Sequence, residues 1–175
     1  MEVSKTVADS DYRALCEFLF KEASILDRHQ YSDWLNLLDP GIEYRLFNRL
    51  VSEFNRKDSD EVGDAVSLLN EHYRNLEFRV AQLVTPNYTV AENPRSKMRR
   101  HITNVIAEPG EHEGEFRVFS NCLVFRSRDA GRRGDVFSLG REDVIRKVEG
   151  RLLLVSRSAE LDEAIVSARG LSTLF

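Results

Sequence analysis

Apolar residues recur at helical spacing in the first quarter of the chain. Counted from Tyr12, apolar residues follow after three, four, seven, 11 and 14 positions, which places them on one stripe of an amphipathic helix. Asp9 or Ser10 is expected to cap the first turn of this helix through its side-chain oxygen. A second, shorter stripe over residues 31–38 predicts another helix, which the Asp39-Pro40-Gly41 turn is expected to end.

One strand and the longest helix of the chain are predicted next. Apolar and charged residues alternate over residues 42–46, which predicts a strand with one buried face. Residues 48–60 are polar and show no periodicity, so we interpret them as a loop. Over residues 62–83 the apolar positions are spaced alternately by four and three, which predicts a helix of about six turns.

The second half of the chain has the pattern of strands. Four long segments are separated by glycine-containing turns, and they span residues 98–108, 115–128, 135–148 and 151–161. Their short connections are typical of hairpins in an antiparallel sheet. Helices followed by strands predict an α+β fold with the helices packed on one face of the sheet. We interpret residues 1–175 as a single domain, because no linker, repeat or low-complexity tract interrupts them.

Composition narrows the class of protein. The 175 residues are 42% hydrophobic and 31% charged, which is typical of a globular domain and excludes a disordered or collagen-like chain. Cys16 and Cys122 are the two cysteines, too few for a disulfide scaffold. No apolar run approaches the ~18–20 residues of a membrane span, and the first ten residues lack the apolar centre of a signal peptide. We therefore expect a cytoplasmic protein that binds no membrane.

The net charge of −4 conceals two parts of opposite sign. Residues 1–94 hold 10 basic and 17 acidic side chains, whereas residues 95–157 hold 14 basic and nine acidic ones. Arginine supplies 20 of the 25 basic residues, a bias that favours planar, bidentate contacts at protein interfaces. The acidic chain, with a pI near 5.6, argues against nucleic acid as a partner. The arginines of the strand region indicate either a docking surface for another subunit or ordinary charged strand edges.

The sequence contains no recognised motif for metal binding or nucleophilic catalysis. Its four histidines show no zinc-type spacing, and neither cysteine lies in a Cys-x-His element of an iron–sulfur site. There is also no Gly-x-Ser-x-Gly elbow and no phosphate-binding loop.

General acid–base chemistry is the remaining route to an enzyme. Asp33, Tyr44 and His101 are candidates to face a pocket between the helices and the sheet, where desolvation shifts pKa values. They would make the chain a stand-alone isomerase or dehydratase. The simpler interpretation, which we favour, is that Asp33 solvates a helix, Tyr44 packs in the core and His101 pairs across strands.

Several segments, in order along the chain, are similar to those of one protein family. They are Phe20-Lys-Glu-Ala-Ser-Ile-Leu-Asp27, Tyr31-Ser-Asp-Trp-Leu35, Ala91-Glu-Asn-Pro94, Arg99-Arg-His-Ile-Thr-Asn-Val105, Phe137 with Gly140-Arg-Glu-Asp-Val144, and Leu171-Ser-Thr-Leu-Phe175. Together they resemble the small (beta) subunit of the Rieske-type aromatic-ring-hydroxylating dioxygenases over essentially the whole chain. No single segment is diagnostic, but their shared order over the full length makes the match specific.

The resemblance implies a nuclear-transport-factor-2-like cone, with three N-terminal helices packed on a strongly curved, mostly antiparallel sheet. It also implies a chain with no catalytic residue, cofactor-binding residue or metal ligand, which assembles with a large (alpha) subunit and other beta subunits. The usual assembly is a hexamer of three large and three small subunits. The large subunit would hold a Rieske 2Fe–2S cluster and a mononuclear Fe(II), and electrons from NADH would arrive through a reductase and usually a ferredoxin. The holoenzyme would add both atoms of dioxygen to an aromatic ring to give a cis-dihydrodiol.

Two finer expectations complete this interpretation. Segments 91–94 and 99–105 resemble most closely the members that act on biphenyl and polycyclic aromatic hydrocarbons. For subunit contacts we expect Trp34, Arg99, Arg100, Arg141 and Phe175. Because the chain ends on two apolar residues, its last segment is expected to be tucked into its own fold or into a neighbouring chain.

Overall fold

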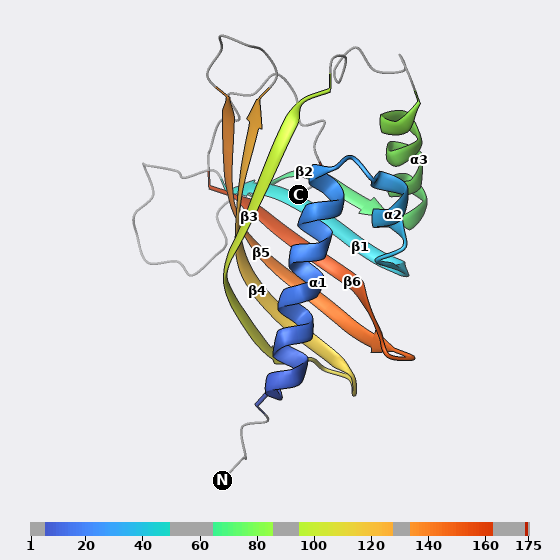
Figure 1. The fold of residues 1–175 in the computed structure, drawn as a ribbon, viewed down its shortest axis with the longest axis vertical. Helices are drawn as coiled ribbons and strands as arrows, with labels where there is room; N and C mark the ends of the chain where they lie inside the picture. The colour runs from blue at the N-terminus through green and yellow to red at the C-terminus, as the bar shows by residue number, and fades with distance from the viewer. Residues whose placement is uncertain (1–5, 50–64, 86–94, 128–133, 163–173, 175) are drawn as a thin grey trace.

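The described residues form a six-stranded sheet with helices on one face (Figure 1). This computed structural model describes residues 6–49, 65–85, 95–127, 134–162 and 174. The elements are α1 (Asp9–Asp27), α2 (Tyr31–Leu35), β1 (Leu38–Arg49), β2 (Ala65–His72), α3 (Tyr73–Val84), β3 (Lys97–Pro109), β4 (Glu115–Ser127), β5 (Asp135–Val148) and β6 (Arg151–Leu161). The strand order is β2-β1-β6-β5-β4-β3, and neighbours are antiparallel except for β1 and β6. The predicted α+β fold is confirmed, with a mixed sheet.

Helix α1 follows the predicted apolar stripe and lies across the sheet (Figure 1). Its buried face includes Leu15, Leu19 and Leu26. The predicted side-chain cap is wrong, because the helix begins one residue earlier than expected and Ala8 is its N-cap. Acidic side chains in its first turn still lie at the positive end of the helix dipole. No described helix is long and apolar enough to cross a membrane.

Helix α2 is shorter than predicted. It ends at Leu35, and the chain enters β1 at Leu38, so the Asp39–Gly41 turn lies inside a strand instead of ending a helix. Asp39 Oδ1 accepts a hydrogen bond from the Gly41 amide at 2.8 Å, next to the point where the register between β1 and β6 shifts. The strand predicted at residues 42–46 is confirmed within β1.

The helix predicted over residues 62–83 is wrong in its first part. Residues 65–72 form β2, and α3 begins only at Tyr73. A bulge explains the misleading spacing: Val66 pairs with Asn48 and Leu69 pairs with Leu46, so a step of two residues on β1 matches a step of three on β2. The predicted loop over residues 48–60 begins inside β1, and the part beyond residue 49 lies outside the described residues.

The four strands predicted in the second half are confirmed to within one residue at each end. The turn between β5 and β6 consists of Glu149 and Gly150, which both have positive φ, at 48° and 81°. A two-residue turn of this kind matches the twist of the strands that it joins. Gly114, with φ of 77°, has the same role in the connection between β3 and β4.

The strong curvature expected of the sheet is not observed. A sheet curls tightly where bulges kink neighbouring strands together. Here the ladder between β4 and β5 runs without a shift over its whole length. The register shifts of other strand pairs are not aligned across the sheet. In the β3–β4 pair the shift follows Thr103, and in the β5–β6 pair it follows Val144. The expected block of three N-terminal helices is also interrupted, because β1 and β2 precede α3.

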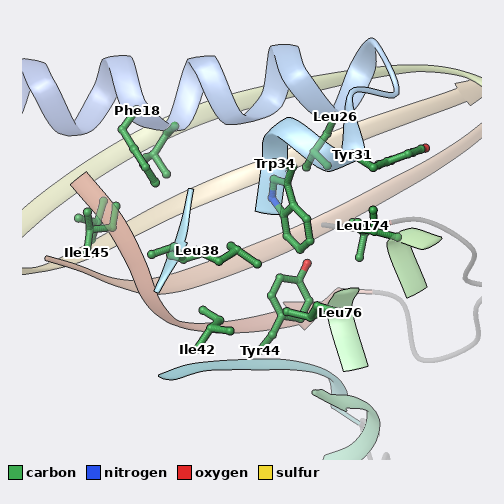
Figure 2. Packing of buried hydrophobic residues seen from close by; sticks show 14 of the residues in the cluster. Phe18, Leu26, Tyr31, Trp34, Leu38, Ile42, Tyr44, Leu76, Ile145 and Leu174 are labelled. Carbon is green, nitrogen blue, oxygen red and sulfur yellow. The ribbon is translucent and has the colours of Figure 1, made fainter. Parts of the chain in front are cut away.

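The core lies between the helices and the sheet (Figure 2). Trp34 and Tyr44 are fully buried there and meet edge to face, with ring centres 6.1 Å apart. Leu174 belongs to the same cluster and is 1% exposed. The expected burial of the end of the chain is therefore confirmed for Leu174, whereas Phe175 lies outside the described residues.

Candidate functional site

Four charged side chains meet in the interior, between α1 and the sheet. Glu22 comes from α1, Arg141 and Asp143 come from β5, and Arg157 comes from β6. Each of these residues is at most 4% exposed. Two carboxylates and two guanidinium groups sum to zero, so no net charge is buried. We call these four residues the interior charge cluster.

Arg157 holds the cluster together. Its Nη1 and Nη2 donate to Oε1 and Oε2 of Glu22, both at 2.8 Å. Its Nε and Nη2 donate to Oδ1 and Oδ2 of Asp143, also at 2.8 Å. The planar guanidinium thus makes two bidentate contacts, which a lysine could not make. Its Cζ also lies 5.9 Å from the ring centre of Tyr44, a cation–π contact.

Glu22 is held in its ionised form. Its Oε1 accepts a third hydrogen bond, from Trp34 Nε1 at 3.0 Å. Burial alone would raise the pKa of Glu22, but the charges of Arg157 and Arg141 and the hydrogen bonds outweigh burial and lower this pKa to about 2. Although desolvation opposes it, the attraction of Asp143 and Glu22 holds the pKa of Arg157 well above its usual value.

Arg141 is the least satisfied member of the cluster. Its Nε donates to Ser120 Oγ at 3.3 Å, and its Nη1 lies 3.7 Å from Oε2 of Glu22. Its buried Nη2 has no hydrogen-bond partner among the described residues. Arg141 therefore contributes to the charge balance more than to the hydrogen bonding of the cluster.

The chemistry of the cluster suits structure better than catalysis. A general base works best with a pKa near the operating pH. Glu22 has a pKa of about 2 and three donors on its two oxygens. Its carboxylate therefore takes up no proton near neutral pH, and its role is to tie α1 to the two strands beneath it.

Sequence reasoning missed the cluster, although a signal was present. Glu22 lies three residues after Leu19 and four before Leu26, on the apolar stripe of α1. Asp143 and Arg157 likewise fall at buried positions of their strands. A charged residue at a core-facing position needs a buried partner of opposite charge. Three such positions on three elements could have indicated the cluster.

The acid–base candidates are not brought together. Tyr44 faces the interior, opposite Arg157 in the register between β1 and β6. His101 is exposed on the other face of the sheet, opposite the exposed Leu123. Asp33 is exposed on α2. Because Tyr44 and His101 lie on opposite faces of one sheet, the described geometry does not support a shared acid–base site.

Most residues expected at subunit contacts are buried within the chain itself. Trp34, Arg100 and Arg141 are buried, and Phe175 lies outside the described residues. Arg99 is exposed on β3. The expectation of contacts with other subunits therefore remains a prediction. Arg99 is the best position for a test, because it is exposed and its substitution does not disturb the interior.

Arg100 links the end of the chain to the end of α1. Its Nη1 and its backbone amide donate to the two carboxylate oxygens of Asp27, at 2.7 and 3.0 Å. Its Nη2 donates to the carbonyl oxygen of Leu174 at 2.5 Å. We call this arrangement of three residues the terminal latch.

Other arginines of the strand region also have partners inside the chain. Their ion pairs are Arg117–Glu142 at 2.7 Å, Arg126–Asp135 at 2.8 Å and Arg146–Glu115 at 2.7 Å. Part of the arginine bias is therefore explained by pairing across neighbouring strands of this chain.

The residues that the structure describes do not fit the iron centres that the resemblance assigns to the large subunit. Cys122 is buried in an apolar cluster, and burial raises the pKa of its thiol, which disfavours the thiolate that binds iron. His29 Nδ1 lies 2.9 Å from the Tyr31 hydroxyl. Within the described ranges, no three side chains of His, Cys, Asp or Glu are placed to hold a metal ion.

The comparison with protein families decides the identity of the chain. Residues 21–168 match the family described as the ring hydroxylating beta subunit. The chain belongs to this family. It is the small (beta) subunit of an aromatic-ring-hydroxylating dioxygenase, and thus part of an oxidoreductase, as the resemblance in its sequence predicted.

Three known proteins show how the beta subunit compares with relatives. It is 29% identical to the beta subunit of a 3-phenylpropionate/cinnamic acid dioxygenase from Photorhabdus laumondii, over 98% of this chain and 95% of the relative. It is 33% identical to the small oxygenase component of a naphthalene 1,2-dioxygenase system from a Ralstonia species, over 94% and 86%. Its fold matches that of a chain in a solved naphthalene 1,2-dioxygenase with indole bound, at a TM-score of 0.85 and 26% identity, over 98% and 89%.

Proposed function

We propose that this beta subunit is a non-catalytic, structural partner of a large subunit in a dioxygenase that cis-dihydroxylates aromatic hydrocarbons. The interior charge cluster is the observation that carries the proposal. Paired charges occupy the space between α1 and the sheet, and the glutamate among them has a pKa far below the range of a general base. Such an interior stabilises the fold of a structural subunit. We therefore assign the dioxygenase reaction to another chain of the complex.

The proposed large subunit holds a Rieske 2Fe–2S cluster and a mononuclear Fe(II). Electrons from NADH reach them through a reductase and a ferredoxin. The donor set of the beta subunit supports this division, because its cysteines and histidines do not fit either centre. The name of the Ralstonia relative, a small oxygenase component, supports a larger component as the partner.

The proposed holoenzyme contains three large and three small subunits. Each small subunit is proposed to be a single domain of the nuclear-transport-factor-2-like class. The continuous sheet, to which strands from residue 38 to residue 161 contribute, supports one domain, and helices confined to one face support the class. The Leu174 carbonyl bound by Arg100 brings the end of the chain into the same unit.

For the substrate we propose a biphenyl or polycyclic aromatic hydrocarbon. The 33% identity to the component of a naphthalene system supports this class. The beta subunit is also 29% identical to a subunit of a phenylpropionate system, so an aromatic acid is the competing substrate class. Turnover of naphthalene, biphenyl and 3-phenylpropionate by the reconstituted holoenzyme tests the choice.

Purification of the beta subunit alone and with its large subunit tests the structural role. Alone, it is expected to contain no stoichiometric iron, to lack a Rieske absorption spectrum and to turn over no aromatic substrate. With the large subunit it is expected to form a complex whose mass equals that of three large and three small subunits. Iron, a Rieske spectrum or turnover in the isolated chain would overturn the proposal, as would a monodisperse monomer that ignores the large subunit.

The contribution of basic residues to assembly is best tested at Arg99. Arg99→Glu reverses an exposed charge, whereas Arg100→Glu would place a carboxylate beside Asp27 in the interior and unfold the terminal latch. We expect Arg99→Glu to weaken assembly in low salt while the melting temperature of the isolated chain stays unchanged. Normal assembly of Arg99→Glu in low and high salt would exclude Arg99 from the contact.

A further inference from the structure

Strand β3 lies at one edge of the sheet, so one side of its backbone has no neighbouring strand (Figure 1). Its other side pairs with β4 in an antiparallel ladder. In such a ladder every second residue points its N–H and C=O groups away from the partner strand. On a strand of 13 residues these outward groups are a template for pairing with a strand of another chain, unless something covers them.

Helix α1 packs against β3 and binds the backbone of its free edge at two points. Asp27, the last residue of the helix, accepts a hydrogen bond from the Arg100 amide at 3.0 Å. Tyr12, near the start of the helix, donates from its hydroxyl to the Val105 carbonyl oxygen at 3.0 Å. These partners lie 73 and 93 positions apart in the chain, so the contacts depend on the fold. Two outward-facing backbone groups of β3 are thus bound by side chains of α1.

The space beside the Asp27 contact is too small for another strand. A cavity of about 230 Å³ lies there, and its lining includes Phe20 and Ala23 of α1 and Ile102 of β3. A strand in a packed sheet fills about 160 Å³ per residue, given a rise of about 3.3 Å and spacings of about 4.8 and 10 Å to its neighbours. The cavity therefore holds one or two residues, whereas strands in proteins are usually about 3–10 residues long.

At the other end of the edge, β3 itself is a poor template. A cavity of about 610 Å³ beside residues 105–109 leaves room for about four residues of a strand. Pro109, however, has no N–H to donate. After Thr103 two residues of β3 lie opposite one of β4, and Asn104 within this bulge has a φ of 52°. A bulge bends an edge strand and so disfavours pairing with a regular strand.

Ala107 presents an outward backbone amide at this end of the edge. The Gly110 amide donates to the Glu115 carbonyl oxygen across the turn at 2.7 Å. Counted back from this pair by alternation, Ala107 points its N–H away from β4. The carbonyl group before it on the outer side is that of Val105, which Tyr12 binds. Tyr12 therefore covers the place where a strand of another chain would begin to pair.

We infer that α1 is a strap that keeps the free edge of β3 from pairing with strands of other chains. The strap binds the edge at Arg100 and Val105, and the core holds the strap in place through buried residues such as Leu15 and Leu19. The protection is built into the folded chain. It does not depend on the proposed function, because it acts in the chain before any partner binds.

Removal of the contact at Tyr12 tests the inference. Tyr12→Ala uncovers the Val105 carbonyl group, and Arg13→Ala is the control, because Arg13 is exposed on the same turn of α1. Sedimentation over a range of protein concentrations measures the self-association of each chain. We expect Tyr12→Ala to associate at least about tenfold more tightly than wild type, because each new backbone hydrogen bond favours association by a factor of about two to 12. The control should behave as wild type.

Ala107→Pro separates edge pairing from unspecific aggregation. Proline removes the outward N–H and leaves the ladder with β4 intact, because that amide does not belong to it. The double variant Tyr12→Ala/Ala107→Pro should therefore return to wild-type association. Wild-type association of Tyr12→Ala would overturn the inference, as would enhanced association that persists in the double variant. If circular dichroism shows Tyr12→Ala to be unfolded, Tyr12→Phe, which loses only the hydroxyl, takes its place with the same expectations.

Discussion

Arg157 on β6 and Glu22 on α1, 135 positions apart in the chain, meet through two parallel hydrogen bonds of 2.8 Å. The pair joins the first helix to a strand near the end of the chain. Both side chains are almost fully buried, and Asp143 binds the other edge of the same guanidinium group. These buried groups all have hydrogen-bond partners only when α1 lies at this position over β5 and β6. The pair therefore fixes the position of α1 on the sheet.

Removal of the Glu22 charge is expected to destabilise the isolated chain. In Glu22→Gln the amide cannot balance Arg157 and Arg141, and one of its hydrogen-bonding groups becomes a donor that faces donors. Loss of one partner of a buried ion pair costs about 3–5 kcal/mol of unfolding free energy. Urea unfolding followed by circular dichroism at pH 7 measures the difference.

Glu17→Gln is the matched control for this substitution. Glu17 lies on the same helix and is exposed, so its replacement is expected to change the free energy of unfolding by less than about 0.5 kcal/mol. Equal stabilities of the Glu22→Gln and Glu17→Gln proteins would contradict a structural role for the interior charge cluster.

The same glutamate predicts how stability depends on pH. The pKa of Glu22 falls from an ordinary value of 4.5 to about 2 on folding, so its ionised form stabilises the folded chain above pH 4.5. That stabilisation is lost as pH falls from 4.5 toward 2. The stability difference between wild type and Glu22→Gln should therefore be largest near neutral pH and shrink below pH 4.5. Urea midpoints of both proteins from pH 7 to pH 3 check this, and a difference that stays constant or grows in acid would refute it.

The sequence pattern predicts the boundaries of an element correctly where turns next to that element set them. The strands from residue 97 to residue 161 were predicted within one residue, because turns such as Glu149-Gly150 separate them. The start of α3 was misplaced because the spacing around Leu69 depends on a bulge against β1. That bulge arises from pairing with a distant strand, so no window of sequence around Leu69 contains it.

The candidate site shows the same limit. Contact of Trp34, Arg100 and Arg141 with other subunits remains a prediction, and the structure shows that these buried side chains have partners inside the chain. An arginine on a strand is equally compatible with a surface and with a buried ion pair until its partner is known. For Arg100 that partner, Asp27, lies 73 positions away, so the pairing depends on the fold.

The two cysteines are expected to differ in reactivity. Cys122 is 1% exposed, and burial raises the pKa of its thiol, whereas Cys16 is partly exposed on α1. Because the thiolate is the reactive form, a thiol reagent should modify Cys16 rapidly in the native chain and both cysteines rapidly in urea. Cys16→Ser should abolish the rapid phase, and Cys122→Ser should leave it unchanged. A rapid phase that survives in Cys16→Ser would mean that Cys122 is accessible.

The terminal latch predicts how firmly the end of the chain is held. Arg100→Lys keeps a positive charge but cannot reach both Asp27 and the Leu174 carbonyl with a planar group, so it should lose a charge-assisted hydrogen bond. A bond of this kind contributes about 1.5–3 kcal/mol, so local opening of the terminus should become at least about tenfold more frequent. Carboxypeptidase should then release the last residues of the native chain correspondingly faster, while Lys97→Ala, an exposed position on the same strand, should be digested at the wild-type rate. Asp27→Asn should have the same effect as Arg100→Lys, because it loosens the arginine from the other side. Equal rates in all four proteins would show that the buried Leu174 is held by packing alone.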